Sequence, residues 1–188
     1  MTKKKRFEKM CRESLISENL VKDFLTKKFM LQFHLVPHQE QIALSHSGLH
    51  VPDILCVEKP GVAFEVKEDK MSAKTGNLAF ELSGLSRLRR WGWGEGIKNI
   101  YLMYINHNDY RLDVFDLGMH LARLELELKA LSDRNPSCKC IPGGDQLHPL
   151  YVVPIPLARK LESCITTLFF DDVDLFFFSK SAKSVLGK

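Results

Sequence analysis

Hydrophobic positions along this chain change from helical to alternating spacing and back. Apolar residues recur at helical spacing over residues 14–30 and again over 116–131, and each pattern predicts an amphipathic helix. Ser17, which Glu18 follows, is expected to cap the N-terminus of the first helix. A shorter helix that Gly92 ends is predicted over 87–91.

Runs rich in β-branched and aromatic residues predict strands between these helices. They cover residues 31–36, 51–57, 62–66, 97–105 and 110–115, and turn-forming residues separate them. Residues 38–50 show no clear pattern, and the polar stretches 68–77 and 132–144 predict loops. The order of elements predicts an α/β fold, a sandwich in which helices flank a mixed sheet.

Composition and length indicate one soluble domain with a single core. The chain has 188 residues, of which 45% are hydrophobic and 27% charged. An odd number of cysteines and a basic N-terminus without a following apolar run predict a cytoplasmic protein that enters no membrane. We expect residues 1–131 to form the core and 132–188 to form a C-terminal extension packed on the same domain. The net charge of +4 permits a nucleic-acid partner without requiring one.

The candidate chemistry lies within residues 51–67, VPDILCVEKPGVAFEVK. Asp53, Glu65 and Lys67 fall on two adjacent predicted strands. Mg²⁺ prefers oxygen ligands and keeps several waters, so these two carboxylates and the carbonyl of Val66 would suffice to hold it, and Mn²⁺ is expected to substitute. A bound ion would polarise a phosphodiester and activate water, while Lys67 would stabilise the developing charge. The pattern indicates metal-dependent phosphodiester hydrolysis, without a small-molecule cofactor.

Strand geometry sets a condition for this site. Glu65 and Lys67 share one face of their strand, because successive side chains point to opposite faces. A regular four-residue turn over 58–61 would place Asp53 opposite Val66 and therefore on the wrong face. We predict an odd number of residues in the turn, or a bulge, where proline and glycine stand together.

Pro52-Asp53 followed by Glu65-Val66-Lys67 resembles the signature of the PD-(D/E)XK nuclease superfamily. The resemblance implies a restriction-endonuclease-like fold with a central mixed sheet of about four to five strands, the motif lying on the second and third. It also implies a Mg²⁺-dependent deoxyribonuclease, with an endonuclease favoured and 5′-phosphate products. The stretch Thr75-Gly76-Asn77 with Glu81 further resembles a segment of phage-encoded members, which implies that Glu81 lies near the site.

Further residues are expected to support the motif. Glu81 either holds a metal-bound water or Lys67, or caps the helix that follows. Glu18 occupies the place where the family often has another acid, although a glutamate in a first helical turn is also favourable by itself. Basic residues on both sides of the motif would contact DNA phosphates; they are Lys70, Lys74, Arg87 and Arg90.

Two questions stay open in the sequence. The same fold would also suit a catalytically silent nucleic-acid-binding or assembly protein. The aromatic residues Phe169, Phe170 and 176–178 fit either an element packed on the core or the surface of a homodimer.

Overall fold

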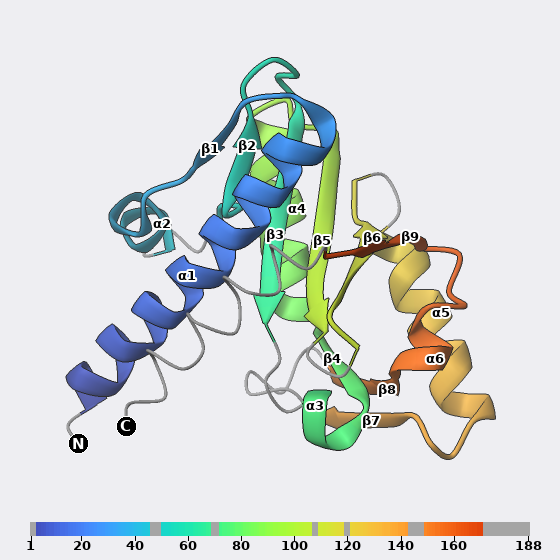
Figure 1. Cartoon of the computed structure of the whole chain (residues 1–188). Coiled ribbons are helices and arrows are strands. Elements are labelled where there is room, and N and C mark those ends of the chain that lie inside the picture. The colour runs from blue at the N-terminus through green and yellow to red at the C-terminus, as the bar shows by residue number, and fades with distance from the viewer. Residues whose placement is uncertain are drawn as a thin grey trace.

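A mixed sheet forms the centre of the molecule (Figure 1). The computed structural model describes residues 3–45, 50–68, 72–106, 109–118, 121–142 and 149–170. Six strands follow the order β1-β2-β3-β5-β6-β9, and only β3 and β5 among the described neighbours are parallel. They are β1 (Phe33–Leu35), β2 (Ile54–Cys56), β3 (Val62–Glu68), β5 (Asn99–Asn106), β6 (Arg111–Asp116) and β9 (Cys164–Phe169).

A smaller sheet and six helices surround this centre in the described part of the chain. The smaller sheet has the order β4-β8-β7, with β4 (Asn77–Glu81), β7 (Lys139–Pro142) and β8 (Pro149–Pro154). The helices are α1 (Lys3–Phe29), α2 (His38–Ser45), α3 (Ser72–Thr75), α4 (Leu82–Gly94), α5 (Leu121–Arg134) and α6 (Ile155–Ala158). α1 crosses one face of the large sheet, whereas α4 and α5 lie behind the other (Figure 1).

Side chains on the two faces of the large sheet are buried in two separate hydrophobic cores. On β3, Phe64 and Val66 point to the α1 side and pack in one core with Val21 and Leu25. The second core joins the opposite face of the sheet to α4, α5 and the smaller sheet, and Leu102 of β5 is buried in it. Apolar burial on both faces fixes the register of the central strands, because a slip by one residue would exchange the faces.

The predicted α/β class with a mixed sheet flanked by helices is confirmed, but the predicted number of strands was too low. The predicted start of the first helix was wrong, since α1 begins at Lys3 and Ser17 lies inside it rather than at a cap. Lysine, arginine, glutamate and methionine dominate the early turns and favour a helix by propensity without forming an apolar stripe. Helix α2 was missed because its eight residues have no amphipathic pattern.

Strands near the C-terminus were also missed. β7 lies in the stretch that was predicted as a loop, β8 pairs with β4, and β9 pairs with β6. Phe170 is buried and its ring lies 5.1 Å from that of Phe24 on α1, whereas Phe169 is exposed. Residues 176–178 fall outside the described residues. Within the described ranges, no helix is both long and apolar enough to cross a membrane.

A buried ion network fastens α6 and β9 to β6. Asp113 of β6 is fully buried and accepts hydrogen bonds from Arg159 Nε at 2.6 Å, Arg159 Nη2 at 3.0 Å and Thr167 Oγ1 at 2.7 Å. The same guanidinium donates to both oxygens of Asp109 at 2.7 and 3.1 Å. Arg159 thus neutralises a carboxylate that has no access to water.

Replacing Arg159 by alanine should therefore destabilise the protein strongly. The substitution leaves Asp113 charged and buried, and we expect a loss of about 3 kcal/mol in the free energy of unfolding. Arg123→Ala is the matched control, because Arg123 pairs with Glu127 and Glu162 at an exposed position and should cost less than about 1 kcal/mol. Urea denaturation of both variants tests this, and equal losses would contradict it.

Candidate active site

The turn between β2 and β3 sets the position of the first acid. The two strands pair Ile54 with Phe64 and Leu55 with Ala63, and residues 57–61 join them. This odd number of residues confirms the predicted irregular turn, and Gly61 has a φ of +98°, a conformation that favours glycine. Continuing the register places Asp53 opposite Glu65.

The main chain changes direction at Asp53. Its N–H donates to the Phe64 carbonyl at 3.1 Å, while its own carbonyl accepts from Val36 on the other side at 2.9 Å. The carboxylate then occupies the edge of β3 that β2 no longer covers, where Oδ2 accepts the Val66 N–H at 2.7 Å. Since the N–H and C=O of one strand residue point to the same edge, the Val66 carbonyl faces Asp53 as well.

Asp53 is buried in a negatively charged environment. Its side chain is buried, and Oδ1 accepts a hydrogen bond from Gln41 Nε2 at 3.1 Å. Burial raises the pKa of Asp53 well above its usual value, and the charges of Glu65 and Glu18 raise it further, against the opposing effect of Lys67. Without a cation, Asp53 therefore holds its proton to a higher pH than an exposed aspartate does.

Glu65 lies deeper and is held by two donors on one oxygen. Oε1 is 2.5 Å from Lys67 Nζ and 2.8 Å from His50 Nε2, and the side chain is 1% exposed. Burial by itself would raise the pKa of Glu65, but Lys67 and His50 outweigh burial and lower the pKa to about 2. Conversely, burial would lower the pKa of Lys67, and the two acids outweigh that effect and raise it.

The remaining oxygen of Glu65 provides a test of whether a metal ion fits. Oε2 is buried and has no hydrogen-bond partner among the described residues, and an ionised oxygen without a partner is costly to bury. A divalent cation would satisfy this oxygen and would offset the repulsion that raises the pKa of Asp53. Carboxylate and carbonyl oxygens are ligands that Mg²⁺ prefers, so the residues present fit this ion. No group of three or more His, Cys, Asp and Glu side chains arranged for a metal occurs among the described residues.

A cavity of about 370 Å³, which we call the polar cavity because charged and apolar side chains line it together, opens next to Lys67 and His50, the two residues that contact Glu65; Asp53 and Glu65 themselves do not line it. Lys67 and His50 line it from the large sheet and the segment before β2, while Glu81 and Arg87 line it from β4 and α4. Tyr104 on β5 also lines the cavity, and its hydroxyl donates to the Ala79 carbonyl of β4 at 2.7 Å. The cavity therefore lies on the face of β3 that carries Glu65 and Lys67.

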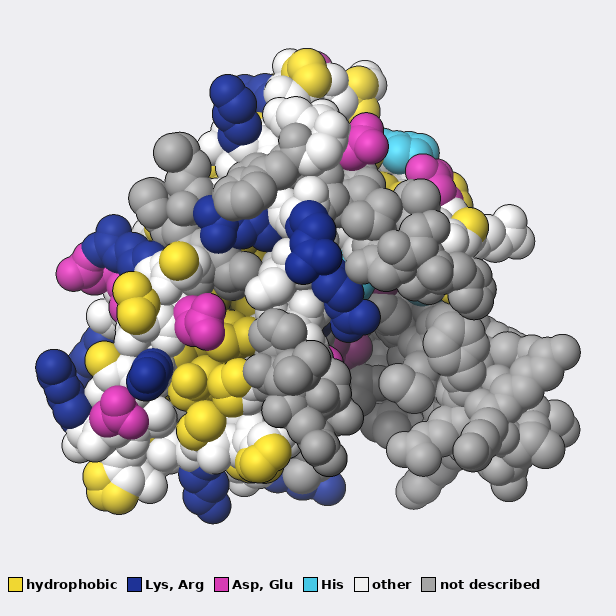
Figure 2. Space-filling model, turned by 180° about the vertical axis from the view of Figure 1, so that it is seen from behind, with side chains coloured by type: hydrophobic (Ala, Val, Ile, Leu, Met, Phe, Trp, Pro, Cys, Tyr) yellow, Lys and Arg dark blue, Asp and Glu magenta, His cyan; other side chains and the backbone are white. Residues whose placement is uncertain are grey.

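On the side of the molecule turned away in Figure 1, a short column of Lys and Arg side chains crosses the centre (Figure 2).

The predicted supporting residues fall into different places. Glu81 lines the cavity at the exposed end of β4 and accepts a hydrogen bond from Ser83 at 3.1 Å. Glu18 is buried in the middle of α1, and its charge acts on Asp53. Arg87 lines the cavity, whereas Lys74 and Arg90 are exposed and do not line it. Lys70 lies outside the described residues.

Four polar residues of the site were missed in the sequence: His38, Gln41, His50 and Tyr104. His38 Nε2 contacts both oxygens of Glu18, at 3.0 and 3.1 Å. No periodic pattern marks these residues, since each acts through contacts to a partner that is distant along the chain. The concentration of histidine and glutamine between Pro37 and Asp53 was the one available signal.

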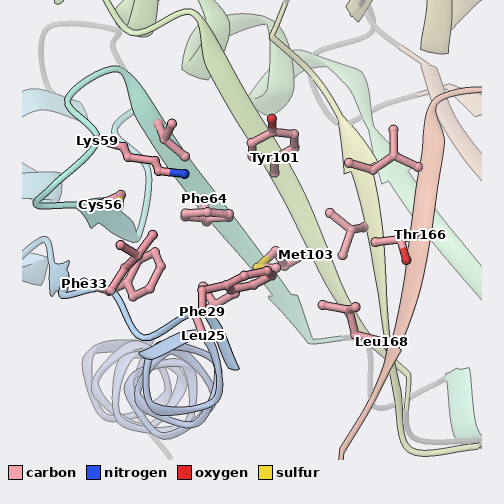
Figure 3. A pocket seen from close by; sticks show the side chains of 14 residues that line it. Leu25, Phe29, Phe33, Cys56, Lys59, Phe64, Tyr101, Met103, Thr166 and Leu168 are labelled. Atoms are coloured by element: carbon pink, nitrogen blue, oxygen red, sulfur yellow. The ribbon is translucent and has the colours of Figure 1, made fainter. Parts of the chain in front are cut away.

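A second cavity, of about 280 Å³, lies on the opposite face of β3, beneath α1. Phe29, Phe33 and Phe64 surround it, and Lys59 extends over its rim from the β2–β3 turn (Figure 3). Its described lining contains no acid. The polar cavity is therefore the one beside the candidate chemistry.

Comparisons of the chain with protein-family models, with curated proteins and with solved structures each gave no match. The assignment of a function therefore depends on the geometry of the site.

The Asp53→Asn variant should be more stable than the wild type in the absence of metal, and increasingly so as pH rises. A carboxyl whose folded pKa lies above its unfolded pKa binds its proton more tightly when folded, so the free energy of unfolding falls as pH rises between the two values. The fall in the free energy of unfolding is at most about 1.4 kcal/mol for each pH unit between the two pKa values. The Asp53→Asn variant lacks this fall, because asparagine does not titrate.

Urea denaturation in a chelator at about pH 4 and about pH 7.5 measures this difference. Asp133→Asn, at an exposed position on α5, is the control and should show little change. A variant no more stable than the wild type at the higher pH would contradict the burial and repulsion assigned to Asp53.

Proposed function

We propose that this protein is a Mg²⁺-dependent nuclease that hydrolyses DNA phosphodiester bonds, with endonuclease action favoured. One observation carries the proposal: Asp53 and Glu65 are buried together at adjacent strands, with Lys67 on one oxygen of Glu65 and no described residue on the other oxygen. Buried acids with opposed pKa values beside a polar cavity are typical of catalytic sites.

Each residue of the motif has a role that follows from its position. Asp53, Glu65 and the Val66 carbonyl would hold the metal ion. When bound, the ion would polarise the scissile phosphate and supply an activated water. Lys67, which is 44% exposed at its side chain, reaches from Glu65 into the cavity and stabilises charge on the phosphate or orients the attacking water.

Support for a restriction-endonuclease-like fold comes from the placement of the motif. Its acids lie at the second and third strands of the chain, β2 and β3, and α1 precedes them and covers one face of the sheet. Glu18 on α1 approaches the site, as the resemblance implies. The position of the motif within the strand order therefore supports both the proposed fold and the proposed activity.

Cleavage of DNA should depend on Lys67 and Glu65. We expect Lys67→Ala and Glu65→Gln each to reduce Mg²⁺-dependent cleavage of plasmid DNA by about 100-fold or more, the scale for removing a group that acts on transition-state charge. Lys59→Ala is the matched control. Lys59 lies in the turn between the same two strands, β2 and β3, but lines the cavity on the opposite face of β3. The control variant should cleave as the wild type does.

The competing function, a silent nucleic-acid-binding protein, gives a different result. That protein would bind DNA without divalent-dependent cleavage, and Lys67→Ala would then change only its affinity. Cleavage that survives in both motif variants would contradict the proposed mechanism, because neither residue would then act on the phosphate.

Arg87 should contribute to DNA affinity more than Arg90 does. Arg87 lines the polar cavity, whereas Arg90 lies on the same helix outside it. Loss of one phosphate contact should weaken binding and reduce the slope of log affinity against log salt by about one. Titration of a labelled DNA duplex at several salt concentrations compares Arg87→Ala with Arg90→Ala, and Ca²⁺ replaces Mg²⁺ to prevent cleavage. Equal losses of affinity would contradict a specific contact between Arg87 and DNA.

A further inference from the structure

Three polar side chains from one short segment each contact a different buried acid. His38 and Gln41 of α2 contact Glu18 and Asp53, and His50, just after α2 and before β2, contacts Glu65. The three contacts span 2.8 to 3.1 Å. The acids come from α1, from the residue before β2 and from β3, so α2 and His50 bridge three elements that are separate along the chain.

We propose that these side chains position the acids for the metal ion, with Gln41 and His50 as the positioning residues for Asp53 and Glu65. This inference rests on the proposed function. An ionised carboxylate only accepts hydrogen bonds, so each histidine donates through Nε2. An amide or a neutral imidazole orients a carboxylate without cancelling its charge, which leaves the negative potential that attracts a cation.

The donors occupy some of the available lone pairs and leave others. An ionised carboxyl group offers about four lone-pair sites. On Glu65, His50 and Lys67 both approach Oε1, and Oε2 has no partner in the described part of the chain. On Asp53, Gln41 takes one site of Oδ1, and the Val66 N–H takes one site of Oδ2.

His50 also explains how Lys67 is able to act on a substrate. Lys67 donates to the same oxygen of Glu65 as His50 does. When Lys67 turns towards a phosphate in the cavity, His50 continues to hold Glu65 in place. Without His50, the same movement would leave Glu65 free to rotate and the metal site poorly formed.

Calorimetric titration with Mn²⁺ tests the inference on the intact chain. Loss of a group that orients a metal ligand typically lowers metal affinity by about 10- to 100-fold, and we expect this from His50→Ala and from Gln41→Met. His50→Gln should recover part of the affinity, because the amide again offers an N–H donor. His34→Ala, at an exposed histidine of β1, is the control and should bind as the wild type does.

Two further readouts separate positioning from general damage. Thermal unfolding in a chelator should give similar midpoints for His50→Ala and His50→Gln, so that their difference in affinity is not a difference in folding. In ¹⁵N spectra the wild-type His50 ring should show the Nε2–H form. If His50→Ala does not fold, Gln41→Met carries the same test at the other acid.

The outcomes distinguish this inference from the proposed function. Wild-type protein that binds Mn²⁺, with unchanged affinity in both His50→Ala and Gln41→Met, would overturn the positioning role and leave the nuclease proposal standing. Wild-type protein that binds no Mn²⁺ would overturn both. Reduced affinity in both variants with recovery in His50→Gln would support the positioning role.

Discussion

The burial of two carboxylates side by side is the constraint on which the candidate site depends. Asp53 and Glu65 are both almost inaccessible to water, and placing like charges together in such surroundings is unfavourable unless other groups oppose the repulsion. Lys67 opposes it from one side, and His50 and Gln41 hold the carboxylates by hydrogen bonds. The electrostatic compensation is incomplete, since one oxygen of Glu65 has no partner within the described ranges and the pKa of Asp53 stays raised.

The scaffold supports this unfavourable arrangement through β3. One face of the strand buries Phe64 and Val66 against α1, and its parallel pairing with β5 runs along its whole length. The buried apolar face and the edge paired with β5 fix the position of the strand, so that Glu65 and Lys67 on the other face keep their geometry at a cost in stability. The cavity is closed on the far side by β4, which Tyr104 ties to β5.

Features that depend on neighbouring residues could be predicted from the sequence, and features that depend on residues far apart along the chain could not. The face of Glu65 and the odd turn after β2 could be predicted, because strand alternation and turn length are local properties of the chain. The start of α1 and the existence of α2 could not, since neither segment has an apolar period. His50 and Gln41 were missed for a related reason: their roles appear only when the fold brings them to acids far along the chain, and a neutral donor leaves no pattern of its own.

A comparison with Asp113 separates a structural buried acid from a candidate catalytic one. Asp113 is as deeply buried as Glu65, yet both of its oxygens receive hydrogen bonds, and Arg159, which also pairs with Asp109, faces it with two charged nitrogens. Such a carboxylate has little capacity left for a metal ion. Glu65 receives its donors on one oxygen only, and the lysine that neutralises it also reaches a polar cavity. Burial alone therefore does not distinguish the two acids; the free oxygen of Glu65 among the described residues, next to a lysine that reaches a cavity, makes Glu65 the candidate.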